Sequence, residues 1–190
     1  MLQEPPSEAL QDITITEEMV EKKLSELKEN KAAGADNISP RFLLEVCAQI
    51  CVPLTRLFLQ SLSDGVVPED WKKANVSPIF KKANKSLAES YRPVSLTSQF
   101  RRILESIMRD SFVNHFENHH LIRESQHRFR KGRSCLSNLL AFLDKVSQYT
   151  EDGEKVDVIY FNFAKAFDKV PHQRLLQKIR NHGIDRTVLK

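Results

Sequence analysis

Cysteine, long apolar runs and internal repeats are scarce or absent in this chain of 190 residues. Three cysteines are too few for the disulfide framework of a small secreted domain. No apolar run approaches the roughly 18 residues of a membrane span, and no secretory signal opens the chain. The length fits one domain without repeats or low-complexity linkers. We therefore expect an intracellular protein, in the nucleus or cytoplasm, with no membrane partner.

Two of the cysteines, Cys47 and Cys51, lie four residues apart on a predicted helix. No second Cys or His pair follows at zinc spacing, so we expect core thiols rather than metal ligands. His115 and His119 have the same spacing, which metals favour, but no third ligand is evident. We expect these histidines at the surface or at a helix end.

The net charge of +4 is unevenly distributed. Residues 1–30 hold eight acids and three bases, whereas residues 71–102 hold eight bases and one acid, Glu89. Phe80 and Tyr91 lie among those bases, and basic side chains interleaved with aromatic rings are typical of surfaces that bind nucleic acid. The alternative is an ordinary solvated basic face.

Periodicity and capping signals predict a helix-rich α/β (α+β) fold with a few short strands. Thr16 is a good helix N-cap, Pro40 and Pro53 are suited to the first position of a helix, and Gly65 and Gly183 are suited to helix ends. Strands are expected at residues 74–80, 93–96 and 156–163. Helices are expected at residues 17 to about 30, 39 to about 50, 53–64, 99–117, 136–150 and in a last segment before residue 183.

The third expected strand has the clearest functional signal. Residues 156–163 are β-branched and aromatic at strand length, which is typical of a buried strand, and residues 164–168 predict the start of a helix. Asn162 would then lie at the carboxyl end of a strand, where open α/β sheets hold their ligands. Alternation along the strand would turn Asp157 to the opposite face.

Five motifs, in one order along the chain, resemble those of reverse transcriptases from non-LTR retrotransposons of the jockey-like LINE group. Residues 160–168 match the family's aromatic-Leu-Asp-Phe-Ser-Lys-Ala-Phe-Asp run, with Asn162 in place of the first Asp. The other four motifs are residues 31–38, 71–82, 91–98 and 126–135. The resemblance implies the N-terminal fingers and partial palm of a right-hand polymerase. Its parts would be an acidic helical segment at 1–30, fingers at 31–97, and a partial palm at 98–190 that ends after the first catalytic motif.

The resemblance also implies an activity and a set of contacts. The family is an RNA-directed DNA polymerase that uses Mg²⁺, an RNA template, a DNA primer and deoxynucleoside triphosphates. Lys81 and Arg92 resemble the residues that hold the incoming triphosphate, and Phe167 resembles the steric gate against a ribose 2′-hydroxyl. The residues that resemble contacts to the nucleic acid are Gln126, Phe129, Arg130 and Arg133. Without the resemblance, these charges would be taken as exposed surface groups and Phe167 as core.

The substitution at residue 162 removes a charge that the family's chemistry needs. The Asp of the family ligates two Mg²⁺ ions, whereas Asn162 and the backbone carbonyl of Phe163 offer only neutral oxygens that cannot bridge two ions. The change should cost on the order of a thousand-fold or more in rate. Asp168 is expected to be structural. The chain contains no Asp-Asp pair for the family's later aromatic-x-Asp-Asp motif, so we expect an inactive fragment.

A second altered position is Arg128, which replaces the usual Gly of a Gln-x-Gly-Phe-Arg motif. If the backbone there requires positive φ, the arginine would strain the turn. Three hypotheses follow. The first is an inactive polymerase fragment, the second a non-catalytic nucleic-acid-binding module through residues 71–102, and the third a non-functional, pseudogene-like product. In the third, an unpaired strand at residues 156–163 would promote aggregation.

Overall fold

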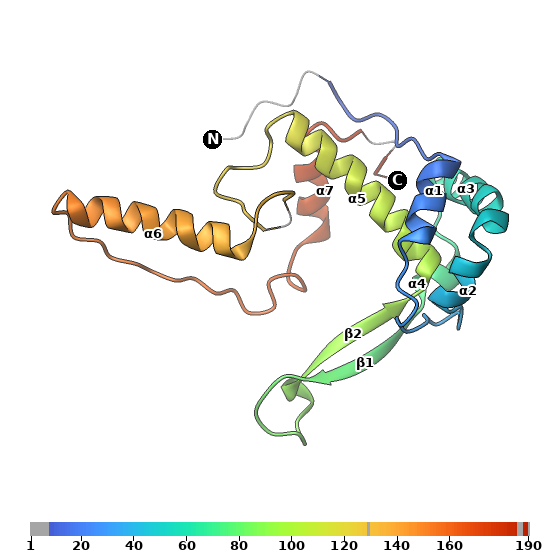
Figure 1. Ribbon diagram of the computed structural model, residues 1–190, viewed down its shortest axis with the longest axis horizontal. Helices are drawn as coiled ribbons and strands as arrows, with labels where there is room; N and C mark the ends of the chain where they lie inside the picture. The colour runs from blue at the N-terminus through green and yellow to red at the C-terminus, as the bar shows by residue number, and fades with distance from the viewer. Residues whose placement is uncertain (1–7, 129, 186–187, 190) are drawn as a thin grey trace. The chain divides into compact units, whose positions relative to one another are not determined.

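The computed structural model describes residues 8–128, 130–185 and 188–189. It is helix-rich, with one two-stranded sheet among the described residues (Figure 1). The chain forms two compact units. Among described residues, the large unit comprises 8–114 and those after 182, and the small unit comprises 115–182. No helix in the described ranges is long and apolar enough to cross a membrane.

Local capping sets the first helices of the large unit. The Thr16 hydroxyl accepts a hydrogen bond from the Met19 amide and caps α1 (Glu17–Ser25). The Ser39 hydroxyl does the same for α2 (Pro40–Glu45), which has proline at its first position. Both starts confirm the sequence prediction. Helix α1 ends earlier than the expected residue 30, and Leu27 packs on the core from the turn that follows the helix.

The boundary between the next two helices differs from the prediction. The backbone breaks at Val46, and α3 (Cys47–Asp64) runs through Pro53 instead of starting there. Proline cannot donate the usual backbone hydrogen bond, which weakens a helix interior. However, α3 buries Cys51 before the proline and Phe58 after it, and burial on both sides holds the helix continuous. The helix ends at Gly65 in the left-handed conformation, as predicted.

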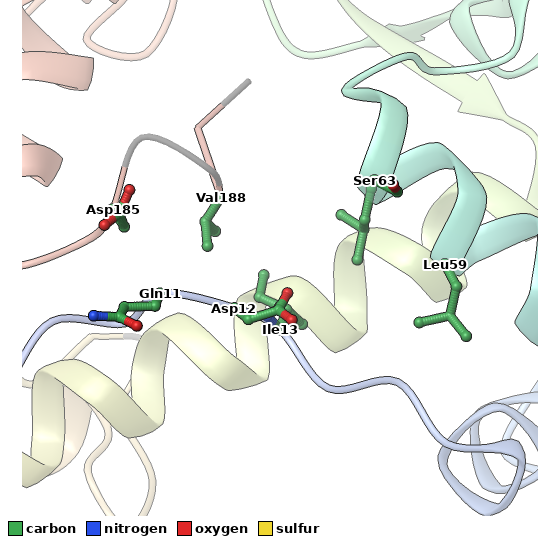
Figure 2. Close-up of a pocket in the computed structure, with 8 residues that line it drawn as sticks. Gln11, Asp12, Ile13, Leu59, Ser63, Asp185 and Val188 are labelled. Carbon is green, nitrogen blue, oxygen red and sulfur yellow. The ribbon is translucent and has the colours of Figure 1, made fainter.

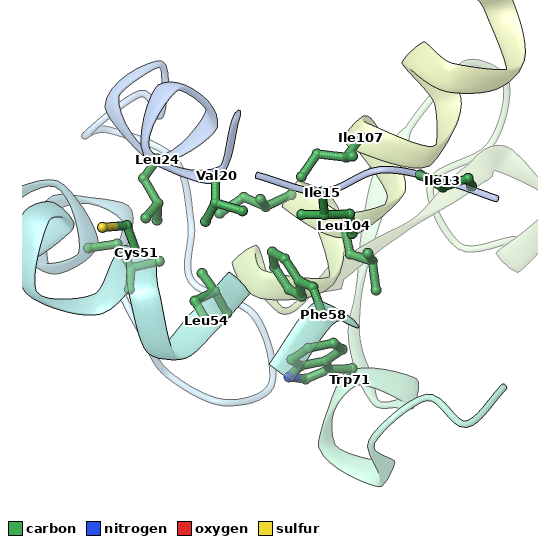
Figure 3. Close-up of a cluster of buried hydrophobic side chains, with 12 residues drawn as sticks. Ile13, Ile15, Val20, Leu24, Cys51, Leu54, Phe58, Trp71, Leu104 and Ile107 are labelled. Carbon is green, nitrogen blue, oxygen red and sulfur yellow. The ribbon is translucent and has the colours of Figure 1, made fainter. Parts of the chain in front are cut away.

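The hydrophobic core lies in the large unit (Figure 3). Phe58 of α3 is fully buried and meets Trp71 of α4 (Glu69–Lys72) edge to face, with ring centroids 5.6 Å apart. Helix α5 (Gln99–Asn118) adds Ile103, Leu104 and Ile107 to this cluster. Leu10 pairs with Ile184 in an isolated parallel bridge, so the start and the end of the large unit are joined by hydrogen bonds.

The sheet is an antiparallel hairpin of β1 (Ala74–Phe80) and β2 (Tyr91–Thr97). The first strand matches its predicted bounds, and the second is longer than the predicted 93–96 by two residues at its start and one at its end. The base of the hairpin is fixed to the turn at Gly34, because a Cβ there would lie 2.6 Å from backbone atoms of Thr97 and Ser98. The Gln99 side chain donates a hydrogen bond to the Ala32 carbonyl, and this bond also holds the turn against the base of the hairpin.

In the small unit, α6 (Cys135–Glu151) and α7 (His172–Asn181) lie close to their predicted positions. A reciprocal capping box between Ser134 and Ser137 fixes the start of α6. No residue of either helix is buried. These helices therefore form from local signals rather than from a packed core.

The strand predicted at residues 156–163 and the helix predicted at 164–168 are wrong. Residues 154–163 have no regular structure, and residues 164–169 form turns. Figure 1 draws this segment as coil between α6 and α7. A strand needs a neighbour to satisfy its backbone hydrogen bonds, and the only strand pair within the described residues is β1–β2. Side-chain preference alone therefore leaves the segment irregular and exposed.

Candidate nucleic-acid interface

The hairpin brings Lys81 and Arg92 to one face. In its register Ile79 pairs with Arg92, and the ladder continues with a 2.8 Å hydrogen bond from the Lys81 amide to the Ser90 carbonyl. Side chains directly opposite each other, or two residues apart on a strand, share a face. Lys81 and Arg92 are thus diagonal neighbours, at about 7–8 Å by strand geometry, and both are exposed.

The connection between the strands is folded against the end of the hairpin. The Tyr91 hydroxyl donates to the Lys85 carbonyl at 2.9 Å, and the Phe80 and Tyr91 rings meet edge to face at 5.6 Å. Lys85 Nζ lies 5.6 Å from the centre of the Phe80 ring. A short 3-10 turn, η1 (Ala88–Ser90), completes the connection. Phe80 and Tyr91 therefore order the loop that carries Lys82 and Lys85.

The positive charge is concentrated on the hairpin rather than along the whole of residues 71–102. We name Lys81, Lys82, Lys85 and Arg92 the hairpin cluster. All four are exposed, and none has an ion-pair partner within the described residues. With no carboxylate of the described residues within ion-pair distance, these side chains are available to phosphate oxygens.

The remaining bases of this stretch are engaged. Lys72 pairs with Glu69 at 2.6 Å, Lys73 with Asp70 at 2.8 Å, and Arg101 with Glu105 at 2.7 Å. Hydrogen bonding between Lys73 and Asp70, with their mutual attraction, raises the pKa of the lysine and lowers that of the aspartate. Arg102 donates to the Thr97 hydroxyl. The excess of bases counted from the sequence thus overstates the charge free to bind a ligand, because two acidic partners lie just before residue 71.

Residues predicted to contact the nucleic acid lie in the small unit before α6. Gln126 donates to the Arg128 carbonyl at 3.4 Å, and the Arg133 amide to the Arg130 carbonyl at 3.3 Å. The Arg130 guanidinium lies 3.8 Å from Glu117 and also donates to the Arg123 carbonyl, so its charge is already paired. Phe129, also predicted to contact nucleic acid, lies outside the described residues.

Arg128 is not strained. Its φ is not positive, unlike that of four other non-glycine residues in the described parts of the chain, so the backbone condition on which strain was predicted is not met. Sequence reasoning missed its neighbour His127, which is buried and whose Nδ1 lies 2.9 Å from the Ser137 hydroxyl of the capping box. The sequence signal that could have found this contact is the pair Ser134-x-x-Ser137, which marks the start of a helix. The Ser137 hydroxyl serves this capping box and is also free to bond to a residue outside it.

The residues expected at the catalytic centre are exposed on the irregular segment. Asn162 and Phe163 lie on unpaired backbone, and Phe167, which would be core by composition alone, is 82% exposed. Without a strand, the alternation that turned Asp157 away from Asn162 does not apply. Within the described residues no group of three or more His, Cys, Asp or Glu side chains could hold a metal ion. Neutral oxygens on exposed coil do not fit a pair of Mg²⁺ ions.

His115 lies in the last turn of α5, which confirms the helix-end alternative of the prediction, but it is buried rather than at the surface. It is 7% exposed, and its Nε2 lies 2.9 Å from the His182 carbonyl oxygen. Its ring centre is 4.6 Å from that of His119. Among the described residues, no third His, Cys, Asp or Glu side chain joins this pair.

A cavity of about 780 Å³ in the large unit provides no phosphate site. Figure 2 shows Asp12 and Asp185 at its edge, with Leu59 and Ser63 reaching it from α3. Two carboxylates and no basic residue line the cavity, so its charge repels anions. The hairpin is therefore the best candidate interface.

Comparison with known proteins agrees with the motifs. A family model described as "Reverse transcriptase (RNA-dependent DNA polymerase)" matches residues 79–190. The chain is 28% identical over 181 residues to the RNA-directed DNA polymerase from mobile element jockey of Drosophila funebris, covering 95% of this chain and 20% of that protein. It is 26% identical over 165 residues to the probable RNA-directed DNA polymerase from transposon BS of Drosophila melanogaster, covering 86% and 18%. The chain thus spans about a fifth of the length of these relatives.

Proposed function

Because the chain belongs to the reverse transcriptase family, in its non-LTR retrotransposon group, we propose that it keeps a phosphate-binding surface but does not add nucleotides by itself. In this proposal residues 31–97 are fingers and residues 98–190 the start of the palm, after an acidic segment at 1–30. The ligands are an RNA template, a DNA primer or a nucleoside triphosphate, in the nucleus or cytoplasm.

The observation that carries the inactive part of the proposal is the amide at residue 162. Nucleotide addition needs two divalent ions, one to activate the attacking hydroxyl and one on the leaving pyrophosphate. Asn162 brings no charge to them, and the nearest acids along the chain, Asp157 and Asp168, are exposed on irregular backbone. The chain's own residues thus hold neither ion in a productive geometry.

Primer extension by the purified chain tests this part. We expect no incorporation of deoxynucleotides with Mg²⁺ on either an RNA or a DNA template. Asn162→Asp should not restore it, because the sequence contains no Asp-Asp pair to complete the ligand set. Templated incorporation by the unmodified chain, abolished by Asp168→Asn, would show that another carboxylate replaces the missing one.

The binding part of the proposal rests on the hairpin cluster. Lys81 and Arg92 share a face, they have no acidic partner within the described residues, and the guanidinium of Arg92 can hold two phosphate oxygens at once. The Phe80 ring, which is 40% exposed, offers stacking surface beside these charges. The chemistry suits a single strand of RNA or DNA without sequence selectivity.

The salt dependence of binding tests this part independently of catalysis. Anisotropy of a labelled single-stranded oligonucleotide should give a plot of log K against log salt with a slope of about −3, as four phosphate contacts require. Arg92→Gln should flatten that slope by about 0.7. The matched control is Arg56→Gln, an exposed arginine of α3 outside the hairpin, which should leave the slope unchanged. Equal effects of the two substitutions would place binding elsewhere.

A further inference from the structure

The end of the hairpin carries its side chains on two distinct faces. In the register of β1 and β2, Ile79 pairs with Arg92 and Phe80 pairs with Tyr91. Successive residues of a strand point to opposite faces, and residues directly opposite each other share a face. The two rings therefore lie on the face away from Arg92 and Lys81.

Lys85 belongs to the face that carries the rings. Its Nζ lies 5.6 Å from the centre of the Phe80 ring, where the ring attracts a cation. Its carbonyl oxygen accepts the 2.9 Å hydrogen bond from the Tyr91 hydroxyl. One ring of the pair thus holds the side chain of this lysine and the other holds its backbone, so its charge is set on the face opposite Arg92.

The turn that contains Lys85 depends on that hydroxyl. The chain reverses at Ala83, where φ is +74°, a conformation that residues with a Cβ rarely adopt. The Asn84 side chain accepts hydrogen bonds from the amide and the hydroxyl of Ser86, which are contacts within the turn. Among the described residues, the Tyr91 hydroxyl makes the only hydrogen bond that ties residues 82–87 to a strand.

We propose that the hairpin has two phosphate positions, one at Lys81 and Arg92 and a second at Lys85 on the opposite face. Tyr91 is the positioning residue of the second, since it acts through Lys85. The inference rests on the proposed phosphate binding by the hairpin cluster. A nucleoside triphosphate is compact and meets one face, whereas a nucleic-acid strand carries a phosphate on every nucleotide and passes across the end of the hairpin to reach both.

Charge removal separates the two positions. The affinities of the full chain are measured for a labelled oligothymidylate and for deoxythymidine triphosphate, which carries the same base. Arg92→Gln should weaken the binding of both ligands. Lys85→Gln should weaken only the oligothymidylate, about three- to fivefold, with its salt slope flattened by about 0.7, because one exposed contact to a phosphate is lost.

A double-mutant cycle tests the role of Tyr91. Tyr91→Phe removes the hydroxyl and keeps the ring, and it should lower the oligothymidylate affinity about two- to threefold with triphosphate binding unchanged. In a chain that already carries Lys85→Gln, the same substitution should have no further effect, since the side chain that it positions is gone. Tyr149→Phe, which removes a tyrosine hydroxyl from α6, is the matched control and should leave both affinities unchanged.

Hydrogen exchange without ligand gives a second readout of the turn. The Leu87 amide donates to the Asn84 carbonyl, and the Ser90 amide donates to the Leu87 carbonyl. Both amides should exchange faster in Tyr91→Phe, because the turn opens more often without its tie to the strand. Unchanged exchange would show that the turn is held without the hydroxyl and would overturn the role of Tyr91.

The binding results distinguish failure of this inference from failure of the proposed function. Equal losses for the two ligands in Lys85→Gln, or no binding of the triphosphate, would rule out two separate positions. A Tyr91→Phe loss that persists beside Lys85→Gln would show that the hydroxyl does not act through the lysine. If Arg92→Gln weakens binding and Lys85→Gln does not, only the second position is wrong. If neither substitution changes binding, phosphate binding by the hairpin cluster is wrong as well.

Discussion

Gly34 shows how a single residue is fixed by space rather than by backbone conformation. Its φ is not in the left-handed region, yet an added Cβ would lie 2.6 Å from the Ser98 nitrogen and the Thr97 carbonyl. Those are backbone atoms at the junction of β2 and α5, which cannot rotate aside as a side chain can. The turn at residue 34 and the base of the hairpin are thus held in direct contact.

Gly34→Ala should therefore destabilise the large unit by about 2–3 kcal/mol through overpacking. Urea unfolding followed by the fluorescence of Trp71, the only tryptophan, measures this. Gly65→Ala is the comparison, because that residue has φ of 65° and its cost of about 1 kcal/mol is conformational. A smaller loss for residue 34 than for residue 65 would show that the junction can shift.

Phe58 fills the centre of the core, against Trp71. Phe58→Ala should lower the free energy of unfolding by about 3–5 kcal/mol, from lost burial and the remaining cavity. The neighbouring Leu57 is 56% exposed, and Leu57→Ala should change it by less than about 0.5 kcal/mol. Thermal unfolding followed by circular dichroism compares the two, and similar losses would mean that α3 is packed on a different face.

Side-chain partners at this scale were the least predictable from sequence. The caps Thr16 and Ser39 were found because a cap acts within three residues. The pairing of Arg130 with Glu117 and the burial of His115 depend on the path of the chain between distant residues. The sequence therefore identified the residue types of the candidate site. It did not show which of these side chains are engaged in ion pairs or hydrogen bonds within the chain.

At the scale of elements, the ion pair of Lys23 with Asp110 links α1 to α5 at 2.6 Å. Partial burial raises the pKa of Asp110, but hydrogen bonds from Lys23 and Arg109 outweigh it, and the net pKa lies below the usual value. Because the folded state holds the charged form, the stabilisation is complete above the unfolded pKa of about 3.9. It is lost as pH falls through the lower folded value.

Asp110→Asn should remove part of the acid sensitivity. We expect a loss of about 1 kcal/mol or less near pH 6, reduced by solvent screening, and a shallower fall in stability between about pH 4 and pH 2. Unfolding free energies measured against pH give both quantities. Glu45→Gln, which removes an exposed pair within α2, should reproduce neither. Unchanged pH dependence in Asp110→Asn would assign the acid sensitivity to other carboxylates.

Elements were predictable where their stabilising contacts are local. The hairpin strand β1 has its predicted bounds, and α5 and α6 lie within one residue of theirs. Residues 156–163 have the strongest strand composition in the chain but no strand neighbour among the described residues. Helix hydrogen bonds are internal to a segment, whereas strand hydrogen bonds are not, and this difference explains which predictions were wrong.

At the scale of the whole molecule, buried apolar residues are concentrated in the large unit. Hydrogen exchange followed by mass spectrometry at low micromolar concentration should show amides of residues 155–164 exchanging at unprotected rates. Amides of α3 around Phe58 should exchange on the order of a thousand-fold more slowly. Peptides from α6, hydrogen-bonded but without buried residues, should be intermediate. Strong protection of residues 155–164 in dilute protein would indicate an intramolecular partner for them.

The residues of the candidate site divide in the same way, into those placed by local contacts and those that need a distant strand. Lys81 and Arg92 are brought together by a hairpin whose contacts lie within the large unit, so motif and geometry agree. Residues 162–167 required a sheet that the described chain does not supply, and they remain on coil. Sequence motifs therefore placed Lys81 and Arg92 on one exposed hairpin face, where phosphate binding stays a prediction, but overstated the assembly of the catalytic site.

The contact between His115 and His182 has a topological consequence. The chain enters the small unit at residue 115 and leaves it at residue 182, and His115 Nε2 and the His182 carbonyl oxygen are 2.9 Å apart. In sequence, the small unit is thus an insertion into the large unit, and the first and last residues of the insertion lie close together. Replacing residues 116–181 by a few glycine and serine residues would require little loop-closure entropy. The remaining polypeptide would keep the core of the large unit and the hairpin cluster.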